Sequence, residues 1–370
     1  MKKNKRLESR RPFPFRVCYR TGFKVFRFIA SDLWMIEALA EYVFRRFLPE
    51  KTASSNPAAD IVICPKRFYP AAMRLRPERC YLLEAPFRVK EPIQSHKPVK
   101  KVCLIVPDTF QKREDLLRTH FCSLIRSFLF EHEIILLHGA VTAKKGLGIA
   151  FLGHTGSGKT TTLLSLLENN FSFINDDHVA LISHRDKPVA CTSSDEMHLL
   201  EENVDAFKIV RFAKERSPVM RGGKLKRAVF AHEFLPPSKI LKKHPIHTIA
   251  FLEHGASKTG CSSVPHGEGW RRLLDFCQIF ILPNQRAIRR GFCRLVDCLR
   301  SVKFFNLNTG RDARQIPRLV QTMIREAGFK NLSFFPSKKI GKLSGKNFCG
   351  VLRNSFSHKI SRRFSHFSPG

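Results

Sequence analysis

The strongest chemical signal in the sequence is a glycine-rich run that ends in lysine and threonine, residues 153–160, with the pattern G-x-x-x-x-G-K-T. Glycines let a backbone curl so that successive N–H groups converge on phosphate oxygens, and the following helix adds its positive N-terminal dipole. In such a P-loop the lysine reaches the β- and γ-phosphates, and the threonine hydroxyl helps to hold Mg²⁺. We therefore predict a site for ATP and Mg²⁺. Its predicted nucleotide-binding residues are Gly153, His154, Thr155, Gly156, Ser157, Gly158, Lys159, Thr160 and Thr161.

Two adjacent carboxylates follow this run at a short distance. Asp176 and Asp177 come 17 and 18 residues after Lys159, which leaves room for one helix of about ten residues and one short strand. Such a chain segment returns the acids to the phosphates at the carboxyl ends of the strands. A close acidic pair suits phosphoryl transfer, in which one carboxylate orients the metal and the other accepts a hydroxyl proton. The structural alternative is a solvated turn or a helix N-cap. His178 adjoins the pair and is assigned no chemical role.

The elements that must position these residues are visible in the apolar pattern. Apolar strands are predicted at 134–137 and 149–152, a helix at 161–169 and a further strand at 171–175. The P-loop then lies between a buried strand and a helix, which is the context that phosphate binding requires. His138 ends the first strand, and a lone histidine is more often structural than catalytic.

These residues, in this order, carry a resemblance to a known family. The runs 138–141 (His-Gly-Ala-Val) and 175–179 (Asn-Asp-Asp-His-Val) flank the P-loop as in the catalytic core of the HPr kinase/phosphorylase family and of the broader HPr-kinase-like group. The resemblance is strong over 134–182 and weaker to about residue 325. It implies an α/β fold like phosphoenolpyruvate carboxykinase, with a mixed sheet that carries the P-loop.

The resemblance also implies roles for individual residues. It places His138 near the transferred phosphate, makes Asp176 the general base and associates Asp177 with the metal. Lys159 joins the catalytic residues, and Thr160 shares the metal with Asp177. Because related kinases are often hexameric, the resemblance further implies a possible homo-oligomer.

The predicted activity is ATP- and Mg²⁺-dependent phosphoryl transfer to a hydroxyl, on a serine of a small protein or peptide or on a small molecule. One alternative is a small-metabolite kinase like shikimate kinase, although that family begins with its P-loop and here 152 residues precede it. The other alternative is a non-catalytic nucleotide-binding regulatory protein whose basic surface attracts nucleic acid.

Charge is strongly unbalanced. Lys and Arg number 65 against 31 Asp and Glu, a formal net charge of +34. Such a surface attracts polyanions non-specifically, and it occurs without a helix-turn-helix, RRM or zinc-finger pattern that would indicate specific recognition of nucleic acid. The segment 327–370 carries nine of the basic residues and no acidic one, which predicts a flexible tail.

The apolar runs and the cysteines of the sequence indicate in which compartment the protein works. No apolar run approaches the roughly 20 residues of a membrane helix, and the basic segment 1–11 is not followed by the apolar stretch of a secretory signal. The eleven cysteines are odd in number, and none is spaced C-x-x-C. We therefore predict reduced thiols and a cytoplasmic location.

We divide the chain into four parts: a basic flexible N-terminus (1–12), a smaller α+β module (13–130), an HPr-kinase-like P-loop kinase domain (131–328) and a basic tail (329–370). Within the module, a hairpin is predicted over 13–30. Ser31 is the predicted N-cap of a helix that runs to Phe47. Its predicted buried face consists of Leu33, Ile36, Ala40, Val43 and Phe47.

Two further groups could contribute to a phosphate site. Lys224, Lys226 and Arg227 could form a basic clamp, although a solvated loop is the commoner arrangement for such a run. Glu201 and Glu202 could supply a second carboxylate for a metal.

Overall fold

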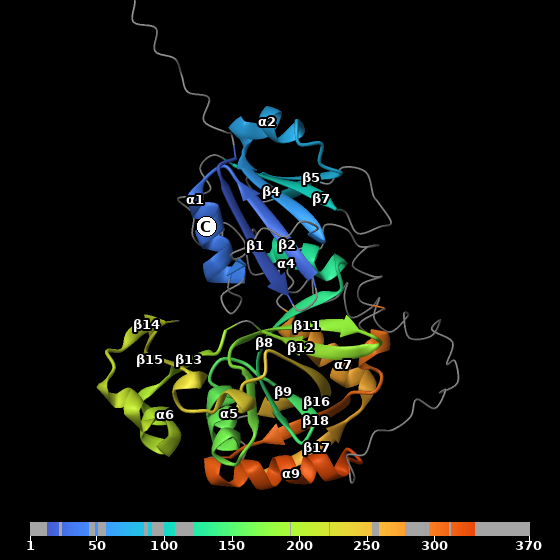
Figure 1. Ribbon diagram of the computed structural model, residues 1–370. Helices are drawn as coiled ribbons and strands as arrows, with labels where there is room; N and C mark the ends of the chain where they lie inside the picture. The colour runs from blue at the N-terminus through green and yellow to red at the C-terminus, as the bar shows by residue number, and fades with distance from the viewer. Residues whose placement is uncertain are drawn as a thin grey trace, which may run out of the picture.

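Two large β-sheets dominate the part of the chain that this computed structural model describes. The described residues are 13–21, 24–43, 49–50, 57–84, 88–90, 100–107, 122–192, 194–221, 223–253, 259–277, 293, 296–310 and 312–329. In Figure 1 one sheet occupies the upper half of the molecule and the other the lower half, with α4 (Cys122–Glu131) between them.

The upper sheet has seven strands in the order β3-β1-β2-β4-β7-β5-β6. The predicted hairpin is confirmed as β1 and β2, which pair antiparallel. The four strands β2, β4, β7 and β5 run parallel to one another, and β6 is antiparallel to β5. The strands are β1 (Phe15–Thr21), β2 (Lys24–Ala30), β3 (Pro49–Glu50), β4 (Ala59–Pro65), β5 (Arg79–Glu84), β6 (Arg88–Lys90) and β7 (Lys101–Val106). The short helices beside them are α1 (Leu33–Ala38), the π-helix η1 (Leu39–Val43), η2 (Lys66–Phe68) and α2 (Tyr69–Met73).

The predicted start of the first helix is wrong, and its predicted face is right only in part: Val43 is buried and Ile36 packs against the core, whereas Phe47 lies outside the described residues. Asp32 is the residue that precedes α1, and the Ser31 hydroxyl donates to the Asp32 carboxylate (2.6 Å) instead of capping the helix. Leu33 is half exposed. The helix continues from α1 into a π-helix, whose turn is wider than that of an α-helix, so the 3.6-residue period behind the prediction does not hold along its whole length. The fully buried residues of this face are Met35, Leu39 and Val43.

The lower sheet has eight strands, and its two longest strands change partners along their length. The first half of β8 pairs with β11 and its second half with β9 and β10, while β16 pairs first with β12 and then with β9 and β18. The strands are β8 (Ile134–Lys144), β9 (Leu147–Leu152), β10 (Ser172–Asn175), β11 (His178–His184), β12 (Lys187–Cys191), β16 (Lys243–Glu253), β17 (Gly260–Val264) and β18 (Lys303–Asn308). Since β16 is parallel to β9 and β18 and the other pairs are antiparallel, the protein has a mixed α/β fold, as the sequence predicted.

Helices and a small third sheet surround the lower sheet (Figure 1). None of the helices within the described ranges combines the length and apolarity needed to cross a membrane. The α-helices are α5 (Lys159–Glu168), α6 (Glu201–Ala206), α7 (His266–Phe276) and α9 (Ile316–Glu326), and the 3₁₀ helices are η5 (Lys208–Glu215), η6 (Ala231–Glu233), η7 (Pro237–Lys239) and η8 (Ala313–Gln315). The third sheet consists of β13 (Glu196–Leu199), β15 (Lys224–Phe230) and β14 (Val219–Arg221).

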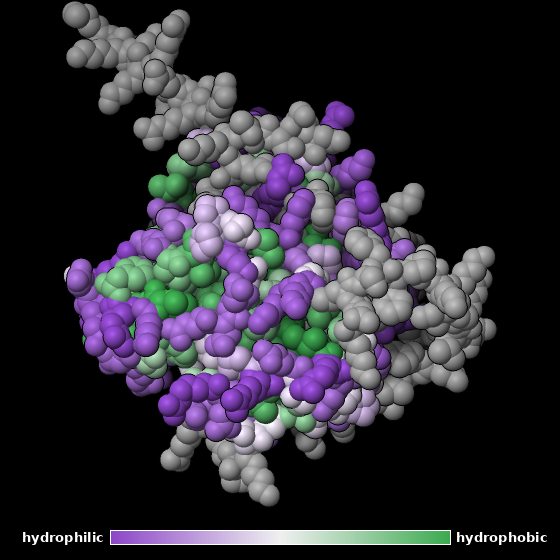
Figure 2. Space-filling model, turned by 60° about the horizontal axis from the view of Figure 1, so that its bottom comes forward, coloured by the Kyte–Doolittle hydropathy of each residue, from purple (hydrophilic) through white to green (hydrophobic). Residues whose placement is uncertain are grey.

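The β14–β15 hairpin carries exposed apolar side chains. Met220 and Leu225 are cross-strand partners, and 65% and 59% of their surfaces are exposed. Figure 2 shows apolar residues among hydrophilic ones on the left of the molecule, the side on which Figure 1 draws this hairpin. The basic run 224–227 lies in β15. It thus forms a strand and not the solvated loop that was the commoner expectation.

One hydrophobic cluster joins the two large sheets. It contains Phe26 of β2 and Ile61 of β4 together with Ile134 of β8 and Ile182 of β11. The predicted division at residues 130 and 328 is not tested by this packing and stays a prediction. Of the predicted basic ends, residues 1–12 lie outside the described part of the chain, and so does the tail 329–370 except for Phe329.

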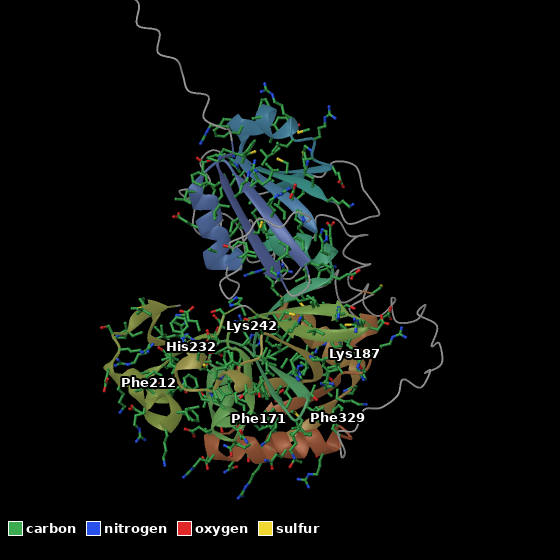
Figure 3. The ribbon with its side chains drawn as sticks, in the orientation of Figure 1. Phe171, Lys187, Phe212, His232, Lys242 and Phe329 are labelled. Carbon is green, nitrogen blue, oxygen red and sulfur yellow. The ribbon has the colours of Figure 1, made fainter. Side chains whose placement is uncertain are left out.

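His247 ties two strands of the lower sheet together. Its Nδ1 accepts a hydrogen bond from the Gly148 backbone N–H (3.2 Å), and its ring meets Phe329 edge-on at 5.8 Å. Burial lowers the pKa of His247 to about 4, with smaller contributions from His244 and Lys187. Figure 3 labels Phe329 near α9 and Lys187 at the start of β12.

This low pKa predicts acid sensitivity. As the pH falls from about 6.5 toward 4, His247 becomes protonated in the unfolded chain but stays neutral in the folded protein. The free energy of unfolding therefore falls. We expect this one group to account for roughly 2 kcal/mol of that loss after solvent screening. Urea unfolding at pH 7 and pH 4 measures it: His247→Gln, which keeps an acceptor and does not titrate, should lose less stability than the wild type. An equal loss in both proteins would contradict this prediction.

Candidate functional site

A glycine-rich loop, residues 153–158, connects β9 to α5. Gly156 and Gly158 both have φ of 85°, a left-handed conformation that glycine adopts without a steric penalty. The helix begins directly after Gly158, two residues earlier than the sequence predicted, so Lys159 and Thr160 lie in its first turn. The strand–loop–helix order is the predicted one, and the unpaired N–H groups of the first turn face the loop.

Lys159 is folded back into this loop. Its Nζ donates to the carbonyl oxygens of Gly153 (2.8 Å) and His154 (3.0 Å), and only 8% of the residue is exposed. Burial lowers the pKa of Lys159, an effect that Asp176 and Asp177 oppose. The lysine is thus a positive charge held inside the loop with both carboxylates in electrostatic range.

Asp176 follows β10 and lies against the first turn of α5. The Thr160 hydroxyl is 3.2 Å and 3.1 Å from its two carboxylate oxygens, and 4% of Asp176 is exposed. A hydroxyl and a carboxylate side by side at a helix N-terminus are a donor set that Mg²⁺ accepts. It is therefore Asp176, not Asp177, that the structure places beside Thr160.

Asp177 instead contacts two histidines. Its Oδ1 is 2.8 Å from His138 Nδ1 and its Oδ2 is 3.3 Å from His178 Nδ1. His138 Nδ1 also lies 3.0 Å from the Asp177 carbonyl oxygen, so this nitrogen faces two acceptors and carries the ring proton. His138 and His178 are directly opposite each other on β8 and β11. The ligand atoms of this group lie within 4.8 Å of one another, so it could also hold a metal ion.

The partner change in β8 creates this arrangement. Directly after His138, the strand leaves β11 and joins β9, and the Gly139 N–H donates to the Asp177 carbonyl oxygen (2.9 Å). A Cβ on Gly139 would lie 2.8 Å from the Phe151 carbonyl oxygen, so no larger residue fits there. Asp177 itself has φ of 95°, a strained conformation that costs about 1–3 kcal/mol and that aspartate tolerates better than most residues.

The two histidines change the acidity of Asp177. Burial acts to raise its pKa, but the contacts from His138 and His178 outweigh burial and hold the pKa well below its usual range. Burial also lowers the pKa of His178, which keeps this imidazole neutral near pH 7. Asp177 is consequently ionised at every pH at which the protein would work.

One polar atom of the loop is left without a partner. The Ser157 Oγ is buried and makes no hydrogen bond to the described residues, although a buried hydroxyl without one costs about 1–3 kcal/mol. An oxygen-rich ligand in the loop would satisfy it. This orphaned hydroxyl, the lysine and the two positive-φ glycines fit the triphosphate of a nucleotide.

The remaining predicted residues are engaged elsewhere. The Thr161 hydroxyl donates to Asn203 Oδ1 of α6 (2.9 Å). Arg227 pairs with Glu201 (2.8 Å), so these two side chains neutralise each other. The positive charge of Lys226 repels that of Lys159 and thereby contributes to the lowered pKa of Lys159.

Sequence reasoning missed His178. Its signal was present, because it directly follows the acidic pair, but its contact with Asp177 depends on how β11 pairs with β8. Glu253, Arg272 and Phe276, which lie across from the loop, were also missed, since no motif marks them.

Among known proteins, distant similarity is found at the level of structure. No protein-family model and no curated protein sequence matches this chain. Among solved structures, the HPr(Ser) kinase/phosphatase from Coxiella burnetii matches with 10% sequence identity and a TM-score of 0.29, over 53% of this chain and 97% of that one.

Proposed function

We propose that the protein transfers the γ-phosphoryl group of ATP to a hydroxyl in a Mg²⁺-dependent reaction. The observation that carries the proposal is the contact of Asp176 with the Thr160 hydroxyl at 3.1–3.2 Å. It means that an acid from a separate strand reaches the first turn of the helix that follows the glycine-rich loop. A glycine-rich turn with a purely structural role would need neither this acid nor a buried lysine.

The loop and Lys159 would bind the phosphates. Lys159 would exchange its contacts with the Gly153 and His154 carbonyl groups for contacts with the β- and γ-phosphates, and the Ser157 hydroxyl would gain an acceptor. The N-terminal dipole of α5 favours negative charge at the same place. Once Lys159 has made this exchange, these groups face the phosphates and can neutralise the charge that develops on them.

Thr160 and Asp176 would hold the metal. A bound Mg²⁺ supplies charge neutralisation to the phosphates. The resemblance to the HPr-kinase-like group assigned the metal to Asp177 and the base to Asp176. The contacts favour the reverse assignment, because the carboxylate beside Thr160 belongs to Asp176 and the carboxylate beside His138 belongs to Asp177.

Asp177 would receive the proton. The acceptor oxygen forms a bond to the γ-phosphorus, the bond from that phosphorus to the β–γ bridging oxygen breaks, ADP leaves, and the hydroxyl proton passes to the Asp177 carboxylate. Because the transition state of phosphoryl transfer is loose, the proton moves late and the carboxylate mainly orients the hydroxyl. The low pKa makes Asp177 a weak base but keeps it ionised, so that it can accept a hydrogen bond from the hydroxyl, and His138 would keep the carboxylate in position. The acceptor is a serine of a small protein or peptide, or a small molecule.

The test of this proposal is Mg²⁺-dependent binding of ATP, measured by calorimetry. We expect wild-type protein to bind ATP at least tenfold more tightly with Mg²⁺ than with EDTA, and Asp176→Asn to lose most of that difference because it removes one metal ligand. Asp205→Asn is the matched control, an exposed acid paired with Lys214, and should behave like the wild type. Failure of the wild type to bind ATP, or an unchanged Mg²⁺ effect in Asp176→Asn, would refute the proposed site.

A further inference from the structure

A pocket of about 500 Å³ opens beside the glycine-rich loop. Loop residues 154–157 form one wall, and the end of β16 and the last turn of α7 form the other. Its volume is typical of a site for a small organic molecule. Because the loop is one of its walls, a ligand bound to the loop continues directly into the pocket.

The wall opposite the loop is aromatic. The Phe276 ring packs almost parallel to Phe251, with centroids 6.0 Å apart and an interplanar angle of 25°, and it lies 5.4 Å from the His154 ring of the loop. Phe276 is only partly buried, so the pocket has access to it. A flat apolar surface beside a polar loop suits an aromatic heterocycle.

The polar groups of the pocket are two carboxylates and one guanidinium. Arg272 lies over the Phe251 ring at 4.4 Å, donates to Glu253 Oε1 (3.1 Å) and also contacts Asn306. Its charge is thereby offset by Glu253, and the Asp275 carboxylate also lines the pocket. Carboxylates accept hydrogen bonds from hydroxyl and amino groups and repel phosphate. The pocket therefore offers hydrogen-bond acceptors to the hydroxyl and amino groups of a ligand.

The pocket is also separate from the groups that would act on the acceptor. Neither Asp176, Asp177 nor His138 is among its lining residues, so a molecule there does not meet the proposed proton acceptor. The phosphate acceptor must bring its hydroxyl to Asp177 and thus approaches from elsewhere. This leaves the nucleoside as the occupant.

We infer that this pocket binds the nucleoside of the nucleotide whose phosphates lie in the loop. The base lies against Phe276, which packs on the buried ring of Phe251. Glu253 and Asp275 accept hydrogen bonds from ribose hydroxyls or from an amino group of the base. The inference rests on the proposed function, because it uses the loop as the phosphate site. It assigns Phe276 and Asp275 as determinants of affinity for the nucleoside.

Two probes, ATP and inorganic tripolyphosphate, separate the loop from the pocket. Both carry the phosphate chain, and only ATP carries the nucleoside. We expect wild-type protein to bind ATP at least tenfold more tightly than tripolyphosphate. In Phe276→Leu, which keeps an apolar side chain but loses the flat ring, we expect ATP binding to weaken about tenfold and tripolyphosphate binding to stay unchanged.

Two further variants separate an effect of the pocket from a general effect on folding. Asp275→Asn alters an exposed residue of the same pocket and should weaken ATP severalfold without affecting tripolyphosphate, and Phe212→Leu on η5 should change neither. Equal affinity of the wild type for the two probes, or an equal loss for both in Phe276→Leu at an unchanged melting temperature, overturns the inference alone. Failure of the wild type to bind either probe refutes the proposed function, and the inference with it.

Discussion

Replacing Lys159 with alanine should weaken the binding of Mg²⁺-ATP about a hundredfold, because it removes the cation that would face two phosphates in a buried loop. Hydrogen bonds to a charged group contribute about 1.5–3 kcal/mol each, and here the full charge is lost as well. Isothermal titration calorimetry measures the change directly, without knowledge of the phosphate acceptor.

Lys144 offers a matched control for this experiment. It is also a lysine near α5, and its Nζ donates to the Asn169 carbonyl oxygen at the other end of that helix (3.0 Å). Lys144→Ala should bind Mg²⁺-ATP like the wild type. If Lys159→Ala keeps wild-type affinity, or if both variants lose affinity equally, the assignment of the loop as a phosphate site is wrong. A melting temperature for each variant shows whether the loss reflects unfolding.

The loop could be predicted from the sequence because everything that shapes it is local. A buried strand, three glycines and a helix start follow one another within about 20 residues, and the positive φ at Gly156 and Gly158 is a property of those residues. Its partners could be predicted only in part. The acidic pair was identified by spacing, but which of its members meets Thr160 depends on the chain reversal between β10 and β11.

Long-range pairing explains what sequence reasoning missed. His178 reaches Asp177 and His138 because β8 abandons β11 for β9 directly after His138, and no local pattern encodes that exchange. The pocket beside the loop could not be predicted for the same reason, since Glu253 and Phe276 come from β16 and α7, about 100 residues after the loop. The error in the first helix has a different origin, because its face follows from π-helical geometry that a 3.6-residue period does not describe.

The second large effect is expected for Asp177→Asn, which should lower the rate of ADP release from Mg²⁺-ATP about a thousandfold and change ATP affinity less than threefold. The substitution removes the carboxylate that orients the acceptor hydroxyl and finally takes its proton, together with the negative charge between two imidazoles, and a positioned acid–base group typically contributes 10²–10⁴-fold. Asparagine is the suitable replacement because, like aspartate, it tolerates the positive φ of this position. The measurement is steady-state ADP release. Asp176→Asn gives the contrast, because that variant should lose the effect of Mg²⁺ on ATP affinity, which Asp177→Asn should keep.

Asp177→Asn should also change how stability depends on pH, which separates an ionised carboxylate from a neutral one. The pKa of Asp177 is lowered in the folded protein, so its ionisation stabilises the fold above the unfolded value near 3.8 and loses that effect as the pH falls below it. Urea unfolding should thus show a larger gap between wild type and variant at pH 7 than at pH 3. A gap that stays constant over this range would mean that the histidines do not hold the carboxylate in its charged form. For the turnover prediction, an unchanged rate of ADP release in Asp177→Asn would mean that Asp177 takes no part in the reaction. A loss of ATP affinity as large as the loss of rate would make Asp177 a binding residue instead.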